Sequence, residues 1–237
     1  MKSLSILPVT LLFQFIGLFM VPGCAKEGTN MLTTIATDSL LKSYLALGDS
    51  YTIGEFVGSA ERFPTQTVAL LKSHGSKVAD PQYIAQTGWT TLDLQNAISK
   101  ATLKSKYDIV SLLIGVNDQY EGLDTAGYRV HFTQLLQKAI QLADNQIKHV
   151  FVVSIPDYSV TPFGGGSERV KKEIDAFNNI NKQVTATYQI SYTDVTPTSR
   201  LAANDQSFTA NDGLHPSGKQ YQQWAALLEA VMLPVVK

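Results

Sequence analysis

The sequence contains a single cysteine, Cys24, among 237 residues. A lone cysteine cannot close an internal disulfide, so we expect no structural role for it within the fold. The net charge is −1 and the basic residues form no block, which argues against a nucleic-acid partner. The chain has no internal repeat, no low-complexity tract and no Pro/Ser-rich seam that would divide it. The hydrophobic fraction of 44% fits a packed globular domain.

The amino-terminal residues have the composition of a secretory signal. Lys2 is followed by an uncharged, largely apolar run over residues 4–21, and a small residue precedes Cys24. The run could instead span a membrane as an anchor, but Pro8 and Pro22 and its marginal length argue against that alternative.

The position of Cys24 resembles the lipobox of bacterial lipoproteins, in which the cysteine becomes the lipidated first residue of the mature chain. The resemblance implies a signal peptide over residues 1–23, an extracytoplasmic location and a membrane anchor through a lipid on Cys24. A free cysteine in a cleaved or disordered leader is the alternative. The residues that follow indicate a tether over 24–40, and we expect one folded domain over 41–237.

The rest of the chain alternates short apolar runs with segments of helical period. Ile109 to Ile114 is nearly all apolar, whereas Leu94, Ala97 and Ile98 share one helical face. Five such β-then-α units in sequence predict an α/β fold, a three-layer sandwich with a five-stranded parallel sheet between helices. The expected strands are 44–47, 78–85, 107–114, 150–155 and 190–195.

Polar residues follow the carboxyl ends of these strands, which share one edge of a parallel sheet. Ser50 follows the first strand, Gly88 the second and Asn117 the third, while Asp212 and His215 come after the fifth. The sequence therefore predicts that a hydroxyl, a glycine amide, a carboxamide, a carboxylate and an imidazole gather at one edge.

Acyl transfer uses this set of groups. Ser50 becomes a useful nucleophile when a base such as His215 takes its proton, and Asp212 can fix the tautomer of the imidazole. The amides of Ser50 and Gly88 and the side chain of Asn117 could form an oxyanion hole, where each donor lowers a barrier by roughly 3–4 kcal/mol. We expect Pro216 to begin the final helix, which would place His215 just outside it.

Four blocks resemble those of the SGNH or GDSL-type esterases and lipases, in order and over most of the mature chain. The blocks are Gly48-Asp49-Ser50, Gly88, Gly115-Val116-Asn117-Asp118 and Asp212-Gly213-Leu214-His215-Pro216. The resemblance implies a flavodoxin-like sheet, a triad of Ser50, His215 and Asp212, oxyanion donors at Ser50, Gly88 and Asn117, and no cofactor. Tyr51 departs from the leucine of the family name, at a position known to vary, and leaves the catalytic assignment intact.

Other functions are less well supported. Gly48 to Thr52 lacks the second glycine of the Gly-x-Ser-x-Gly elbow, which argues against an α/β-hydrolase of that type. A catalytically silent glycan-binding module and a flavodoxin-like cofactor protein remain as alternatives. No histidine is spaced with cysteines or carboxylates as a metal ligand would be. The sequence indicates no oligomeric state.

The substrate of the expected esterase is a small-molecule or glycan ester. No long apolar lid segment is evident, which favours short acyl groups or acetylated carbohydrate. Several residues near the predicted edge could line a pocket, although core or loop packing is the simpler interpretation for any one of them. These residues are Tyr51, Glu55, Phe56, Trp89, Tyr120, Tyr158 and Phe163.

Overall fold

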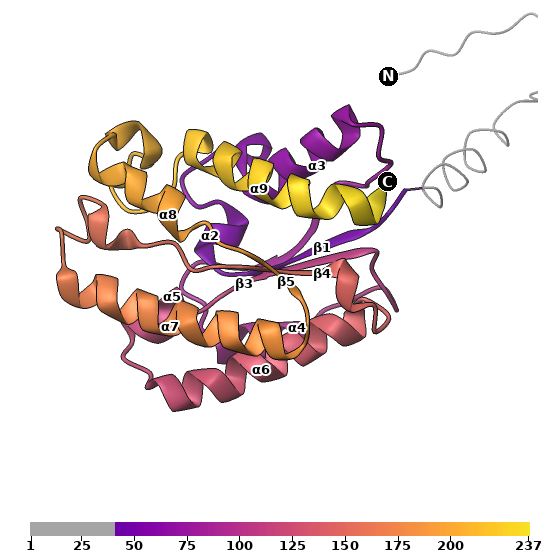
Figure 1. Ribbon diagram of the computed structural model, residues 1–237, viewed down its shortest axis with the longest axis horizontal. Coiled ribbons are helices and arrows are strands. Elements are labelled where there is room, and N and C mark those ends of the chain that lie inside the picture. The colour runs from indigo at the N-terminus through magenta and orange to yellow at the C-terminus, as the bar shows by residue number, and fades with distance from the viewer. Residues whose placement is uncertain (1–40) are drawn as a thin grey trace, which may run out of the picture.

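The computed structural model describes residues 41–237, so the predicted signal peptide, the tether and Cys24 lie outside the described residues. The described chain forms a five-stranded parallel sheet in the order β2-β1-β3-β4-β5, with helices on both faces (Figure 1). The predicted α/β/α sandwich is therefore confirmed. The strands are β1 (Tyr44–Gly48), β2 (Gln82–Ala85), β3 (Ile109–Leu113), β4 (Val150–Val153) and β5 (Ser191–Thr193).

The three central strands are buried along their whole length, because helices cover both faces of the sheet. This explains why they are apolar runs rather than alternating ones. The register pairs Leu47 with Leu112 and Leu112 with Val152. From β1 the chain adds β2 on one side of the sheet and then β3, β4 and β5 on the other. In open α/β sheets such a switch point opens a crevice at the carboxyl ends of the strands.

The helices form two layers. One face of the sheet is covered by α3 (Phe63–Ser73) and α9 (Gly218–Val236), and the other by α4 (Thr91–Lys100), α6 (Thr125–Leu142) and α7 (Glu168–Thr187) (Figure 1). Three short helices follow strands at the carboxyl edge: α2 (Ser50–Ile53), α5 (Val116–Tyr120) and α8 (Thr196–Ser199). The 3₁₀ turns are η1 (Ser59–Glu61), η2 (Ile147–His149), η3 (Tyr158–Val160), η4 (Arg200–Ala203) and η5 (Gln206–Phe208).

An aromatic cluster joins α3 to α9. Trp224 and Tyr221 on α9 and Phe63 on α3 are fully buried, and the Trp224 ring centroid lies 6.0 Å from that of Phe63 and 5.1 Å from that of Tyr221. Truncating a buried aromatic side chain to alanine costs about 3–5 kcal/mol. The cluster therefore fixes α9, and with it the segment carrying His215 that leads into this helix.

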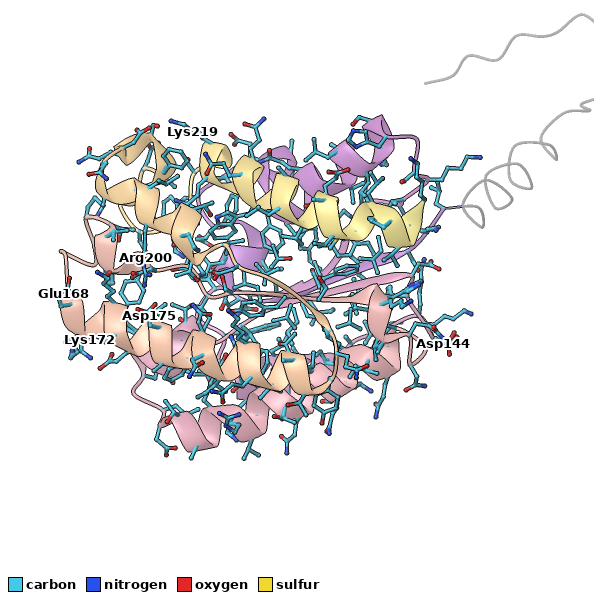
Figure 2. All side chains as sticks on the ribbon, viewed as in Figure 1. Asp144, Glu168, Lys172, Asp175, Arg200 and Lys219 are labelled. Atoms are coloured by element: carbon cyan, nitrogen blue, oxygen red, sulfur yellow. The ribbon has the colours of Figure 1, made fainter. Side chains whose placement is uncertain are left out.

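Charged side chains tie the loops that follow β4 and β5. Arg200 on η4 donates from Nε to the buried carboxylate of Asp157 at 2.8 Å and from a second nitrogen to Asp175 on α7 at 2.6 Å. Figure 2 shows Arg200 and Asp175 facing one another. Such charge-assisted hydrogen bonds are stronger than neutral ones, so this pair of contacts restrains the carboxyl edge of the sheet.

Some predicted element boundaries are wrong. The second strand begins at Gln82 rather than Val78, because Val78 forms only an isolated bridge with Lys42 before the proline at 81 interrupts the ladder. The final helix begins at Gly218 rather than Pro216, because the Ser217 hydroxyl caps it by accepting from the amide of Gln220. The third, fourth and fifth strands are also shorter than expected at their ends.

Candidate active site

Ser50 is the first residue of α2, directly after β1. Asp49 caps this helix, since its Oδ1 accepts from the amide of Tyr51 at 3.0 Å. The tight turn requires glycine at position 48, because a Cβ there would lie 2.1 Å from Thr52 Oγ1 and 2.3 Å from the carbonyl oxygen of Leu113. These contacts hold Ser50 at the carboxyl edge with 4% of its surface exposed.

Burial perturbs Asp49 strongly. Removal from water raises its pKa to about 8, an effect that the hydrogen bond from Tyr51 reduces and the charge of Asp118 reinforces. Its second oxygen, Oδ2, has no hydrogen-bond partner among the described residues. Asp49 is therefore protonated at neutral pH and adds no negative charge beside Ser50.

The predicted oxyanion donors come from three segments that follow different strands: α2, the turn after β2, and α5. The amide nitrogens of Ser50 and Gly88 donate no hydrogen bond to any described residue, so both are free to donate to a ligand. Asn117 on α5 donates from Nδ2 to the carbonyl oxygen of Trp89 at 2.9 Å. That bond uses one of the two amide hydrogens and orients the other.

Asp118 connects two of these loops. Its carboxylate accepts from the amide of Thr91 at 2.9 Å and from the hydroxyl of Thr91 at 2.5 Å, which ties α5 to the first residue of α4. Burial raises the pKa of Asp118, and the two bonds from Thr91 partly offset that effect. Asp118 therefore fixes the loop beside Asn117.

Asp212 and His215 form a hydrogen-bonded pair. Asp212 Oδ2 lies 2.5 Å from His215 Nδ1, and Asp212 Oδ1 accepts from the amides of Leu214 and His215 at 3.1 Å each. Burial would raise the pKa of Asp212, but these hydrogen bonds outweigh it and hold the pKa below its usual value. A carboxylate at this position favours the tautomer with the proton on Nδ1, which leaves Nε2 free to accept a proton.

Ser50, Gly88, Asn117 and His215 line one cavity of about 240 Å³, and Asp212 lies behind His215. Within residues 41–237 no hydrogen bond joins Ser50 to His215. Hydrogen bonds of catalytic groups are often long before substrate binds and shorten afterwards, so this geometry is compatible with proton transfer. The other residues that line the cavity are Tyr51, Thr87, Val116, Tyr120, Tyr158, Phe163 and Leu214.

The aromatic residues near the predicted edge separate into two groups. Tyr51, Tyr120, Tyr158 and Phe163 line the cavity, whereas Phe56 and Trp89 do not, although the carbonyl oxygen of Trp89 accepts from Asn117. Val116 and Leu214 were not predicted as lining residues. Both lie inside the blocks that carry Asn117 and His215, so an apolar residue beside a predicted site residue was the available signal.

The described residues hold no group of three or more His, Cys, Asp or Glu side chains arranged to bind a metal ion. His74, the C-cap of α3, pairs with Glu229 at 2.8 Å, and the Nδ1 of His149 lies 2.7 Å from the carbonyl oxygen of Asp108. Both of these histidines thus have structural contacts.

Several solved structures share this fold. The lipase/acylhydrolase from Enterococcus faecalis is 20% identical, with a TM-score of 0.69 over 83% of this chain and 98% of its own. TesA is 17% identical, with a TM-score of 0.64 over 82% of this chain and 99% of its own. Axe2, an acetylxylan esterase from Geobacillus stearothermophilus, is 18% identical, with a TM-score of 0.61 over 82% of this chain and 94% of its own.

No match is found among curated proteins. The sequence itself matches the GDSL-like lipase/acylhydrolase family over residues 46–223, a span that begins in β1 and ends within α9. Because this span covers most of the chain and includes all four sequence blocks, the protein belongs to the GDSL-like lipase/acylhydrolase family.

Proposed function

We propose that this protein is a serine esterase that hydrolyses carboxylic esters through an acyl-enzyme on Ser50, without a cofactor. The observation that supports the proposal best is that Ser50, Gly88, Asn117 and His215 line the same cavity, with Asp212 hydrogen-bonded to Nδ1 of the imidazole. These groups supply a nucleophile, a base with an orienting carboxylate, and hydrogen-bond donors for a developing negative charge.

In the first half of the reaction, His215 Nε2 takes the proton from Ser50 as Oγ attacks the ester carbonyl carbon. The carbonyl oxygen becomes an oxyanion, which the amides of Ser50 and Gly88 and the side chain of Asn117 stabilise. Asp212 stabilises the imidazolium that forms. When the tetrahedral intermediate collapses, the ester C–O bond breaks and the alcohol leaves with the proton from His215.

In the second half, water attacks the acyl-enzyme and gives one proton to His215. The oxyanion forms again in the same place, and its collapse breaks the bond between the acyl carbon and Ser50 Oγ. Ser50 recovers its proton from His215, and the carboxylic acid is released. The enzyme groups thus return to their starting protonation states, as a catalytic cycle requires.

The cavity supports a small acyl group. Its volume of about 240 Å³ exceeds the ~150 Å³ that holds a benzene molecule and falls below the ~300–1,000 Å³ of drug-sized sites. Its lining includes the apolar or aromatic side chains of Val116, Tyr120, Phe163 and Leu214. We therefore propose short-chain esters or acetylated carbohydrates as substrates, and the likeness to an acetylxylan esterase supports the second class.

Labelling with a fluorophosphonate tests the proposal, because this reagent forms a covalent adduct with an activated serine. We expect one adduct on Ser50, located by peptide mass spectrometry, and turnover of short-chain aryl esters by the wild type. Ser50→Ala should lose both. Ser73→Ala, which changes an exposed serine on α3, is the matched control and should keep both. An adduct on another serine, or none in the folded protein, would contradict the proposal.

The same experiment addresses the alternative of a silent glycan-binding module. The strongly exposed rings of Tyr120 and Phe163 beside the cavity could stack on sugars, which is the observation that favours it. Ester turnover that disappears in Ser50→Ala would exclude the silent module. Binding of acetylated oligosaccharide with no turnover and no labelling would favour it.

We also propose that the mature protein is held at an extracytoplasmic membrane surface by a lipid on Cys24. Among residues 41–237 no helix is long and apolar enough to cross a membrane. The described chain enters at the amino end of β1, while α2, which begins at Ser50, follows the carboxyl end of this strand (Figure 1). Cys24→Ser should move the protein from the detergent phase to the aqueous phase in a detergent partition.

A further inference from the structure

Residues 54–57, which we call the strap, follow α2 and form backbone hydrogen bonds with Ser50. The amides of Gly54 and Glu55 both donate to the carbonyl oxygen of Ser50, at 3.0 Å each. The strap therefore cannot shift without disturbing the backbone of Ser50. Its two central side chains, Glu55 and Phe56, reach in different directions to two other parts of the candidate site.

Glu55 holds the loop that carries Gly88. The hydroxyl of Thr87 donates a short hydrogen bond to the Glu55 carboxylate, across 32 residues of sequence. Thr87 and Gly88 share one peptide unit, so a restraint on Thr87 orients the N–H of Gly88. A turn over residues 86–89, closed by the bond from the amide of Trp89 to the carbonyl oxygen of Gln86 at 3.3 Å, also restrains this peptide. Side-chain packing does not, because Gly88 is exposed and no atom lies within 4 Å of the place where its Cβ would stand.

Phe56 covers one face of the imidazole. Its ring is nearly parallel to that of His215, at an interplanar angle of 15° and a centroid distance of 6.3 Å. Tyr51 contacts the same imidazole in an edge arrangement at 5.7 Å and 62°. The imidazole of His215 thus has two aromatic neighbours, both at distances typical of aromatic pairs.

The backbone at Phe56 is unfavourable for this residue. Its φ is 61°, in the left-handed region that non-glycine residues rarely adopt, and its side chain is 65% exposed. An exposed aromatic side chain on a strained backbone gains little from burial, so stability alone does not account for it. Observed strain of this kind concentrates at functional sites.

We propose that the strap is a positioning element, in which Glu55 aims the Gly88 amide through Thr87 and Phe56 fixes the plane of the His215 imidazole. This inference rests on the proposed esterase function and adds residues outside the four sequence blocks. A displacement of about 1 Å in a catalytic group can reduce the rate ~100-fold, so weak contacts of this kind can control turnover.

The first test removes the Glu55–Thr87 hydrogen bond. We expect Thr87→Val and Glu55→Ala each to lower kcat by about 10- to 100-fold while KM changes less than about threefold, because the oxyanion donor acts mainly in the transition state. Thr87→Ser keeps the hydroxyl and Glu55→Gln keeps an acceptor, so both should stay within about threefold of the wild type. The double variant Glu55→Ala/Thr87→Val should be no slower than the slower single variant.

These variants separate positioning from substrate binding and from structural support. A rise in KM at constant kcat would show that Thr87 or Glu55 contacts substrate and would overturn the proposal. Unchanged kcat, or effects of the single variants that multiply in the double variant, would overturn it as well. Val130→Ala, at an exposed position on α6, is the control for a general surface substitution.

The second test uses the strain at Phe56. Asparagine tolerates the left-handed region, so Phe56→Asn should keep the melting temperature of the wild type or exceed it, while kcat falls by about tenfold or more. Phe56→Tyr retains the ring and should keep kcat. If Phe56→Asn keeps full kcat, the ring does not position His215.

Failure of the strap and failure of the esterase proposal give different results. If the wild type turns over no ester and takes up no fluorophosphonate, the proposed function fails. If the wild type does both and the variants at Glu55, Phe56 and Thr87 behave like it, only the strap inference fails.

Discussion

Replacing Asp49 by asparagine is expected to remove a large part of the pH dependence of folding stability. Burial raises the pKa of Asp49 from 3.8 to about 8, a difference of about 4 units. Each unit corresponds to ~1.4 kcal/mol between the protonated and ionised forms, so ionising Asp49 in the folded protein costs up to about 6 kcal/mol. Asparagine has no proton to lose and keeps the acceptor oxygen for the amide of Tyr51.

The sign follows from proton release. Between pH 3.8 and about 8 the folded protein keeps the proton on Asp49 whereas the unfolded chain does not, so unfolding releases a proton. The stabilisation is complete below about pH 4 and is lost as the pH rises through 8. The free energy of unfolding of the wild type should therefore fall with pH, relative to Asp49→Asn, by up to ~1.4 kcal/mol per pH unit.

Urea denaturation at pH 5, 6, 7 and 8 measures this difference. The advantage of Asp49→Asn over the wild type should grow from the lowest pH to the highest, since all other titrating groups are common to both proteins. Asp80→Asn is the control, because Asp80 is strongly exposed and forms only a surface pair with Lys72. A difference in stability between Asp49→Asn and the wild type that is equal at pH 5 and pH 8 would refute the reasoning.

Three further predictions concern the reaction. Asp212→Asn should lower kcat by roughly 10³- to 10⁴-fold, because asparagine favours the wrong tautomer of the imidazole; an unchanged kcat would contradict the role of Asp212. Asn117→Ala should lower kcat by about 10²- to 10³-fold in stopped assays with aryl esters, and a change confined to KM would argue against an oxyanion role. Phe163→Ala and Tyr120→Ala should enlarge the cavity and raise the ratio of kcat/KM for long acyl chains to that for short ones by about tenfold or more per variant. The ratio is measured with esters whose acyl groups have from about two to ten carbons. An unchanged ratio would show that these rings do not limit the site.

The sheet could be predicted because its signals are local. β1, β3 and β4 are fully apolar runs, and a buried parallel strand needs no other signal than such a run bounded by turns. The edge strand β2 is half-buried along its length, so its sequence is mixed and its start was placed four residues too early. The start of α9 was missed for a similar reason, because the serine at 217 and the proline at 216 are both good helix starters.

The candidate catalytic groups could be predicted because each belongs to a sequence block. Ser50, Gly88, Asn117 and His215 belong to blocks that can be read from neighbouring residues, and the structure gathers them around one cavity. The bond between Glu55 and Thr87 joins residues 32 positions apart, in loops that carry no periodic pattern. A contact of this kind depends on how two loops leave adjacent strands, which is a property of the assembled sheet rather than of either segment.

The glycines of the site show how one residue type can serve different physical needs. Gly48 is required for space, because a Cβ there would collide with Thr52 Oγ1 and with the carbonyl oxygen of Leu113. Gly88 has the opposite surroundings, with a φ of 82° and no atom within 4 Å of a Cβ. Alanine at 88 is therefore opposed only by local backbone strain, whereas alanine at 48 requires β1, α2 and β3 to move apart. Gly48→Ala should lower the melting temperature far more than Gly88→Ala, and Gly88→Ala should reduce turnover in a protein that still folds, because it perturbs the amide that faces the cavity. The reverse order of the two melting temperatures would contradict this reading of the nucleophile turn.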